Sequence, residues 1–270
     1  MAAPRRWTLG GQATIQTPSR LSRLDAALVL LAAATLTGFP FARLLGVEGA
    51  LLLLVLSVVG WRRRVRALMN LGLFGALLVG SASFDRFMNL WPLPAFVAAL
   101  GLLLANRQSI SGGLSFLRPG IVDRKAHFLI VASAVVAGLA LIAWFALAKP
   151  DYAAVRATLF PPVPTYALLL GVVAFSAVNG ALEELAYRGV LLDALDAALG
   201  AGVAPVVIQA LAFGALHVGG FPRGAAGVGL AAVYGIMMGI VRRQTRGLLV
   251  PWLAHILVDV VIGTILIASR

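Results

Sequence analysis

Long apolar runs separated by short polar segments recur along this chain and limit the folds open to it. A helix of about 20 mainly apolar residues spans the hydrocarbon core of a bilayer, and runs approaching this length recur between residues 25 and 268. They lack the strict two-residue alternation of a membrane barrel strand. With 61% hydrophobic and 12% charged residues, the composition is also far from that of a soluble domain. We therefore predict an all-α fold, a polytopic transmembrane helical bundle of about 8–9 spans.

The distribution of arginine predicts how these spans are oriented. Arginine-rich loops alternate with weakly charged ones, and the positive-inside rule places the arginine-rich loops in the cytoplasm. We therefore expect a cytoplasmic N-terminus and an external C-terminus. The segment at 1–24 is too polar for a signal peptide, so the first apolar run is expected to remain as an anchor. The candidate spans lie near 25–45, 47–61, 67–84, 91–106, 126–148, 164–198, 202–219, 224–241 and 247–268.

The charged and sulfur-containing residues exclude several classes of function. The net charge of +12 does not indicate a nucleic-acid partner, because the basic residues fall in short clusters between apolar runs. The chain has no cysteine, which excludes disulfides, iron–sulfur clusters and thiol catalysis. Only Lys125 and Lys149 among the 22 basic residues are lysine, and alanine and glycine are abundant. This bias favours a bacterial source. We therefore expect a multi-pass protein of the cytoplasmic (inner) membrane, in contact with its lipids.

The chemically informative residues are confined to one part of the chain. We expect a cytoplasmic basic segment at 1–24, N-terminal transmembrane helices at 25–148 and a C-terminal transmembrane core at 160–270. The loop at 107–125 is the best candidate boundary between two helical halves, and no internal repeat is evident. The C-terminal half is therefore expected to carry the function. The oligomeric state is left open.

Ionisable residues inside the apolar runs are the strongest functional signal, since a charge in the hydrocarbon region is costly and usually has a role. The chain has only three glutamates, and two of them, Glu183 and Glu184, are adjacent. Two of the three histidines, His217 and His255, also interrupt apolar runs. Phe213, four residues before His217, is expected to form an apolar wall beside it.

Helical spacing gives these residues different roles. Glu184 and Arg188 are four residues apart and share a helix face, where an ion pair offsets the cost of both charges. Glu183 is rotated by about 100° and is left without that partner, which suits a general base. His255 and Asp259 are also four apart, a spacing that lets both side chains converge on one metal ion or one bound water.

The depth of these residues supports a single site. If the runs on either side of Gly200 form an antiparallel hairpin, Glu183 lies opposite His217, each about 22 Å from the turn. His255 and Asp259 lie roughly 12–18 Å from the nearest arginine cluster. We therefore expect these four residues to meet inside the membrane, in a site that opens toward the cytoplasm.

Three short motifs occur in order in these predicted helices. EELAYRG, which begins at Glu183, resembles EExxxR, while FGALH at 213–217 resembles FxxxH and HILVD at 255–259 resembles HxxxN/D. These are the motifs of the CPBP family of intramembrane proteases, also called the ABI family, which includes CAAX prenyl proteases and bacteriocin-processing enzymes. The resemblance covers residues 164–268. Asp259 stands where many relatives have Asn, a variant that the family pattern permits.

The resemblance implies an intramembrane endopeptidase that hydrolyses a membrane-associated peptide or protein. Glu183 would be the base that activates water, and the ion pair of the EExxxR motif would belong to the catalytic set as its scaffold. His217, His255 and Asp259 would complete the site, and this set would suit a catalytic Zn²⁺. The same groups would also suit an oxyanion hole without a metal. The sequence leaves this choice open.

Two functions of other classes also remain open. A non-proteolytic membrane scaffold or immunity-type protein would keep the motifs as a polar core. A proton-coupled carrier would use the buried carboxylates as a relay, although the halves show neither the repeat nor the paired broken helices of transporters. HExxH, GxSG and GxGD, the marks of other intramembrane protease classes, are absent from the chain.

Overall fold

The computed structural model describes residues 21–38, 42–84, 90–107, 117–150 and 163–268. All regular elements within these ranges are helical, with no strand among them, so the predicted all-α class is confirmed. Most of the basic segment at 1–24 and much of the loop at 107–125 lie outside the described residues. The helices are α1 (Arg23–Thr37), α2 (Ala42–Arg62), α3 (Arg66–Ala82), α5 (Leu93–Ala105), α6 (Arg124–Ala148), α8 (Thr165–Glu184), η4 (Leu185–Leu191), α9 (Leu192–Leu199), α10 (Val203–Leu216), α11 (Gly224–Thr245) and α12 (Leu249–Ala268).

Four of these elements are long and apolar enough to cross a membrane. They are α6, the continuous helix Thr165–Leu199, α11 and α12. α3, α5 and α10 are apolar but shorter, and the 14 residues of α10 extend only about 21 Å, less than a hydrocarbon core of about 30 Å. The predicted count of 8–9 spans is therefore not confirmed. An apolar run in the sequence can be longer than the continuous helix that it forms.

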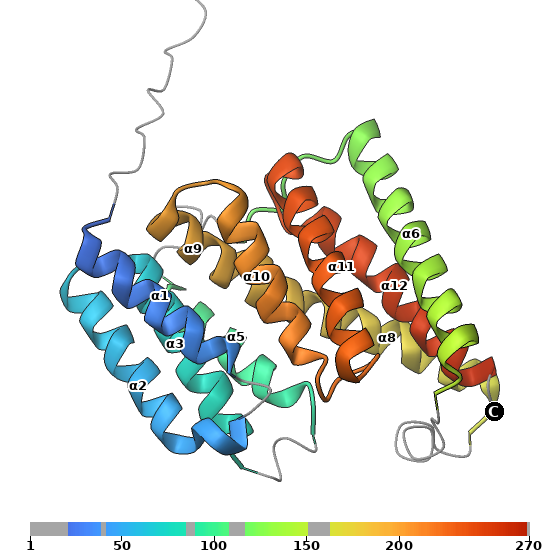
Figure 1. Cartoon of the computed structure of the whole chain (residues 1–270), viewed down its shortest axis with the longest axis horizontal. Coiled ribbons are helices and arrows are strands. Elements are labelled where there is room, and N and C mark those ends of the chain that lie inside the picture. The colour runs from blue at the N-terminus through green and yellow to red at the C-terminus, as the bar shows by residue number, and fades with distance from the viewer. Residues whose placement is uncertain (1–20, 39–41, 85–89, 108–116, 151–162, 269–270) are drawn as a thin grey trace, which may run out of the picture.

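The helices form two groups that meet at the centre of the protein (Figure 1). α1, α2, α3 and α5 lie on one side, α6, α8, α11 and α12 on the other, and α9 and α10 between them. One core joins the N-terminal helices to Leu191 and its neighbours in η4 and α9, and a second joins α6, α11 and α12 to Phe213 of α10. Tyr187 packs against both cores. The segment that carries the EExxxR motif is therefore held from both sides.

The hairpin predicted at Gly200 is present, but its arms separate. Gly200 links α9 to α10 with φ 81°, a left-handed conformation that suits glycine. Beyond this turn α10 packs along α11, while α8 packs along α12. The α10–α11 contact is close, since a Cβ at Gly235 would lie 2.8 Å from the Cα of Ala210. The Gly235–Gly239 spacing therefore serves packing within the chain.

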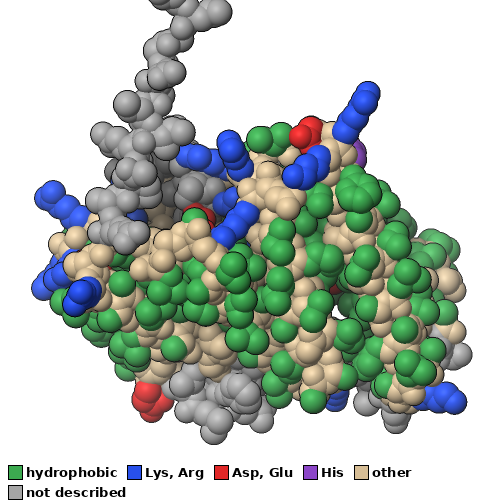
Figure 2. All heavy atoms as spheres, turned by 45° about the horizontal axis from the view of Figure 1, so that its top comes forward, with side chains coloured by type: hydrophobic (Ala, Val, Ile, Leu, Met, Phe, Trp, Pro, Cys, Tyr) green, Lys and Arg blue, Asp and Glu red, His purple; other side chains and the backbone are tan. Residues whose placement is uncertain are grey.

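The middle of the visible surface of the protein is largely apolar. Only 22% of the apolar stretch of α6 is buried inside the protein, so most of this helix needs another apolar environment. Figure 2 shows hydrophobic side chains over the middle of the visible face, with Lys and Arg gathered mainly along its upper margin. Together with the four long apolar helices, this surface identifies an integral membrane protein.

Candidate active site

The EExxxR motif lies where α8 changes into a π-helix. Glu183 and Glu184 end α8, and Leu185–Leu191 form the π-helix η4. π-helical turns are rare and occur often at functional sites. Arg242 of α11 donates from Nε to the carbonyl oxygen of Arg188 at 3.2 Å, which ties this segment to the neighbouring helix.

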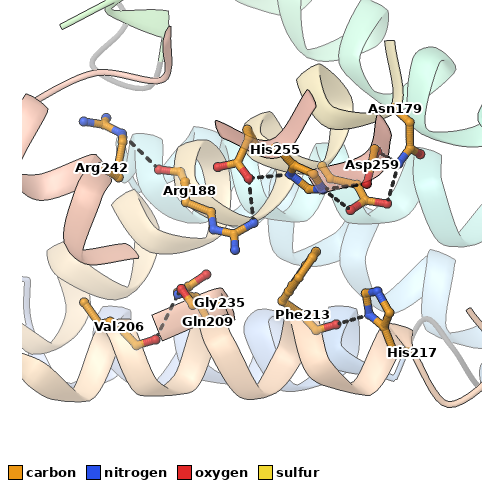
Figure 3. Close-up of polar contacts among 12 residues, drawn as sticks. Asn179, Arg188, Val206, Gln209, Phe213, His217, Gly235, Arg242, His255 and Asp259 are labelled. Carbon is orange, nitrogen blue, oxygen red and sulfur yellow. Dashed lines mark hydrogen bonds and ion pairs between the residues drawn. The ribbon is translucent and has the colours of Figure 1, made fainter. Parts of the chain in front are cut away.

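Glu184, Arg188 and His255 form a buried charged network (Figure 3). Oε1 of Glu184 accepts a hydrogen bond from Arg188 Nη1 at 2.9 Å and lies 2.7 Å from His255 Nδ1. The exposed fraction of each side chain is 4% or less. The ion pair predicted from the spacing of Glu184 and Arg188 is therefore confirmed. The structure adds a third member, because α12 packs along α8 and brings His255 to the same oxygen.

The other nitrogen of His255 faces two further carboxylates. Nε2 lies 3.5 Å from Glu183 Oε2 and 3.6 Å from Asp259 Oδ1. The side chains of Glu183 and Asp259 are 11% and 15% exposed, so both are more accessible than Glu184. The structure thus brings together three of the four residues expected to meet. Because each ring nitrogen faces a carboxylate, the arrangement suits a doubly protonated His255.

Asn179 joins the two carboxylates and was not predicted. Its Nδ2 lies 3.1 Å from Glu183 Oε1 and 3.3 Å from Asp259 Oδ2, while its Oδ1 accepts a hydrogen bond from Trp91 Nε1 at 2.9 Å. The spacing of Asn179 and Glu183, one helical turn, was a usable signal. The contribution of Trp91 had no such signal, because 88 residues separate it from Asn179.

His217 lies at the end of α10, beside Phe213. Its Nδ1 lies 3.2 Å from the carbonyl oxygen of Phe213, and since a carbonyl only accepts, Nδ1 carries the proton. Among the described residues no hydrogen bond or ion pair joins His217 to Glu183, His255 or Asp259. The direct meeting of Glu183 and His217 that the hairpin suggested therefore stays a prediction.

Phe213 forms the predicted apolar wall. Its ring centroid lies 5.1 Å from that of His217 and 6.0 Å from that of His255. The guanidinium carbon of Arg188 lies 4.4 Å from the same centroid, a distance typical of a cation–π contact. One phenylalanine therefore contacts both histidines and the arginine.

Several polar atoms of the network have no partner within the described ranges. They are Oε2 of Glu184 and both Nε and Nη2 of Arg188, all fully buried. Buried polar atoms in proteins are normally satisfied by protein groups or by ordered water.

The geometry of the described residues does not decide whether His217, His255 and Asp259 bind a metal ion. In the part of the chain that the structure describes, no group of three or more His, Cys, Asp or Glu side chains is placed to hold a metal ion. Both nitrogens of His255 face carboxylates. Zinc binding by His217, His255 and Asp259 thus stays a prediction.

A narrow apolar hollow reaches the site from the N-terminal half. Its empty space is about 260 Å³, part of it open to the surroundings, and it has room for about one water molecule. Glu183, Tyr187 and Trp91 are among the residues that line it. The complete lining is Phe74, Leu78, Trp91, Ala95, Leu182, Glu183, Ala186, Tyr187 and Leu216. Helices without any motif therefore help to form the site.

Residues 164–261 match the family model described as type II CAAX prenyl endopeptidase Rce1-like. This part of the chain is similar to the CAAX prenyl endopeptidases. The match runs from the start of α8 into α12 and contains every site residue predicted from the sequence. It confirms the resemblance that the three motifs indicated. No curated protein and no solved structure matches the chain.

Proposed function

We propose that this protein is an intramembrane endopeptidase of the CAAX type, which hydrolyses a membrane-associated peptide or protein. The observation that carries the proposal is the different environment of the two adjacent glutamates. Glu184 is fully buried and bound to Arg188 and His255. Glu183 is partly accessible and lines the apolar hollow. One glutamate is thus fixed as structure, and its neighbour remains available to substrate and water.

In this mechanism Glu183 is the general base. It takes a proton from a water molecule, whose oxygen attacks the carbonyl carbon of the peptide bond, and the proton then passes to the leaving amine. Asn179 fixes Oε1 of Glu183, which leaves Oε2 beside His255 Nε2 at 3.5 Å. A protonated His255 donates from Nε2 to the oxyanion that forms when the water oxygen adds to the carbonyl.

His217 has a different capacity, because its Nδ1 proton is directed to a carbonyl oxygen. In the neutral ring Nε2 is then an acceptor, able to bind a hydrogen of the attacking water. Only the imidazolium form has a second N–H to donate to an oxyanion. We assign His217 the role of holding the water, with the Phe213 carbonyl as the group that fixes its tautomer.

The apolar hollow suits a hydrophobic part of the substrate. The family name specifies a prenyl endopeptidase, and the lining of the hollow is hydrophobic apart from the Glu183 carboxylate, the Tyr187 hydroxyl and the Trp91 indole N–H. The hollow is too narrow for a peptide in the described conformation, so substrate entry requires the two helical groups to separate. We therefore propose a membrane-associated peptide as substrate and α3, α5 and η4 as its walls.

A structural role is the second candidate, because the Glu184–Arg188–His255 network is buried and internally paired. The experiment that separates the two functions uses proteoliposomes and a membrane-anchored peptide library with quenched fluorophores. Glu183→Gln is expected to abolish cleavage while the protein stays folded. Glu48→Gln is the matched control, since Glu48 is an exposed residue of α2. Full activity in Glu183→Gln would favour the structural role.

A further inference from the structure

We infer that Trp91 is a positioning residue for the catalytic carboxylates and that it acts through Asn179. The inference rests on the proposed function of Glu183 as the base. Trp91 precedes α5 and lies outside the matched residues 164–261. Its Nε1 nevertheless donates to Asn179 Oδ1 at 2.9 Å, which connects the N-terminal helices to the site.

The chemistry of the two side chains gives this hydrogen bond a direction. The indole N–H is only a donor, whereas a carboxamide has a donating end and an accepting end. Trp91 therefore binds Oδ1 of Asn179 and directs Nδ2 toward Glu183 and Asp259. In the reversed amide, Oδ1 would face two carboxylates and Nδ2 would face the indole N–H. Both of these contacts are unfavourable, so Trp91 selects one of two orientations.

The selected orientation determines where the base lies. Each N–H of Asn179 serves one carboxylate, at 3.1 Å to Glu183 and 3.3 Å to Asp259. These two acids come from α8 and α12, and both approach the same nitrogen of His255. The amide thus holds two mutually repelling groups at one place. Asn179 is 7% exposed, so water is a poor substitute for Trp91 in fixing it.

Trp91 also lines the apolar hollow together with Glu183. The residue that orients the amide therefore stands at the wall that substrate must touch. This placement explains why the N-terminal half contributes to the site without carrying a motif. It contributes one hydrogen bond of defined direction, donated by a residue that lies outside 164–261.

A double-mutant cycle tests this inference in proteoliposomes. Trp91→Phe removes the indole donor and keeps an aromatic ring, and we expect kcat to fall about tenfold with KM changed less than about twofold, as for a displaced catalytic group. Asn179→Leu is expected to lower kcat at least as much. Because Trp91 acts through Asn179, Trp91→Phe should cause no further loss of kcat in the Asn179→Leu protein. Multiplicative losses would overturn the inference.

Trp252 supplies a matched control. Its Nε1 donates to the carbonyl oxygen of Ala177 at 2.8 Å, an equivalent indole hydrogen bond to the same helix, α8. Trp252→Phe removes that bond without changing the partner of Asn179. We expect its kcat to stay within about twofold of wild type, while a loss equal to that of Trp91→Phe would show a general effect on α8 and overturn the inference.

Thermal unfolding in detergent separates failure of this inference from failure of the proposed function. If the wild-type protein hydrolyses no peptide, the proposed function fails, and the same four proteins still report the hydrogen bond through Tm. Trp91→Phe should lower Tm more in the wild-type background than in the Asn179→Leu background, because the bond exists only in the former. Equal shifts of Tm in the two backgrounds would contradict the Trp91–Asn179 coupling.

Discussion

Removal of the Arg188 side chain should destabilise the protein because it leaves Glu184 charged inside the helical core. Arg188→Met fills a similar volume, so the loss is electrostatic rather than a cavity. Breaking a buried ion pair by removing one partner costs about 3–5 kcal/mol. The substitution also removes the cation–π contact with Phe213, and contacts of this kind contribute about 0.5–2 kcal/mol. His255 still contacts Glu184 Oε1 at 2.7 Å. We therefore expect the lower end of the range, about 3 kcal/mol.

The assay is equilibrium unfolding in mixed detergent micelles, followed by tryptophan fluorescence. Arg243→Met is the matched control, because Arg243 and its partner Asp196 each have 28% of the side chain exposed, and pairs of this kind contribute about 0–1 kcal/mol. Glu184→Gln added to Arg188→Met should restore part of the stability, since no unpaired carboxylate then remains. A loss below about 1 kcal/mol in Arg188→Met, or an equal loss in the control, would refute the reasoning.

Two further predictions follow from single residues. His217→Ala should lower the rate of peptide hydrolysis by about 10²-fold with little change of Tm, because the variant loses a group that positions the water. If His217 holds zinc instead, elemental analysis will find zinc in the wild-type protein and not in this variant. Gly235→Val should destabilise by about 1–3 kcal/mol, because its Cβ would meet the backbone of α10. Gly229→Ala, where nothing lies within 4 Å, should unfold at the same denaturant concentration as wild type or higher.

The sequence predicted the contacts that lie within one helix. Glu184 and Arg188, and likewise His255 and Asp259, are four residues apart, so helical geometry alone places each pair on one face. The different environments of Glu183 and Glu184 follow from the same geometry, because adjacent helical residues point about 100° apart. Phe213 as a wall beside His217 was predicted for this reason too.

Contacts between different helices could not be predicted from residue spacing within one helix. A symmetric hairpin pairs α8 with α10, but in the structure α10 packs along α11 and α8 along α12, and Gly235 permits the close approach of α10 and α11. The approach of His255 to Glu184 depends on α12 lying along α8. The Trp91–Asn179 bond joins two halves with no shared motif. Each of these depends on helix pairing, which apolar runs alone do not specify.

We propose that Glu183 activates water for peptide hydrolysis. Cleavage of a membrane-anchored peptide in H₂¹⁸O, followed by mass spectrometry of the new C-terminal carboxylate, tests this role. We expect one ¹⁸O atom in that carboxylate for wild type and for Glu48→Gln, and no cleavage product for Glu183→Gln. A labelled product formed at the wild-type rate by Glu183→Gln would contradict it.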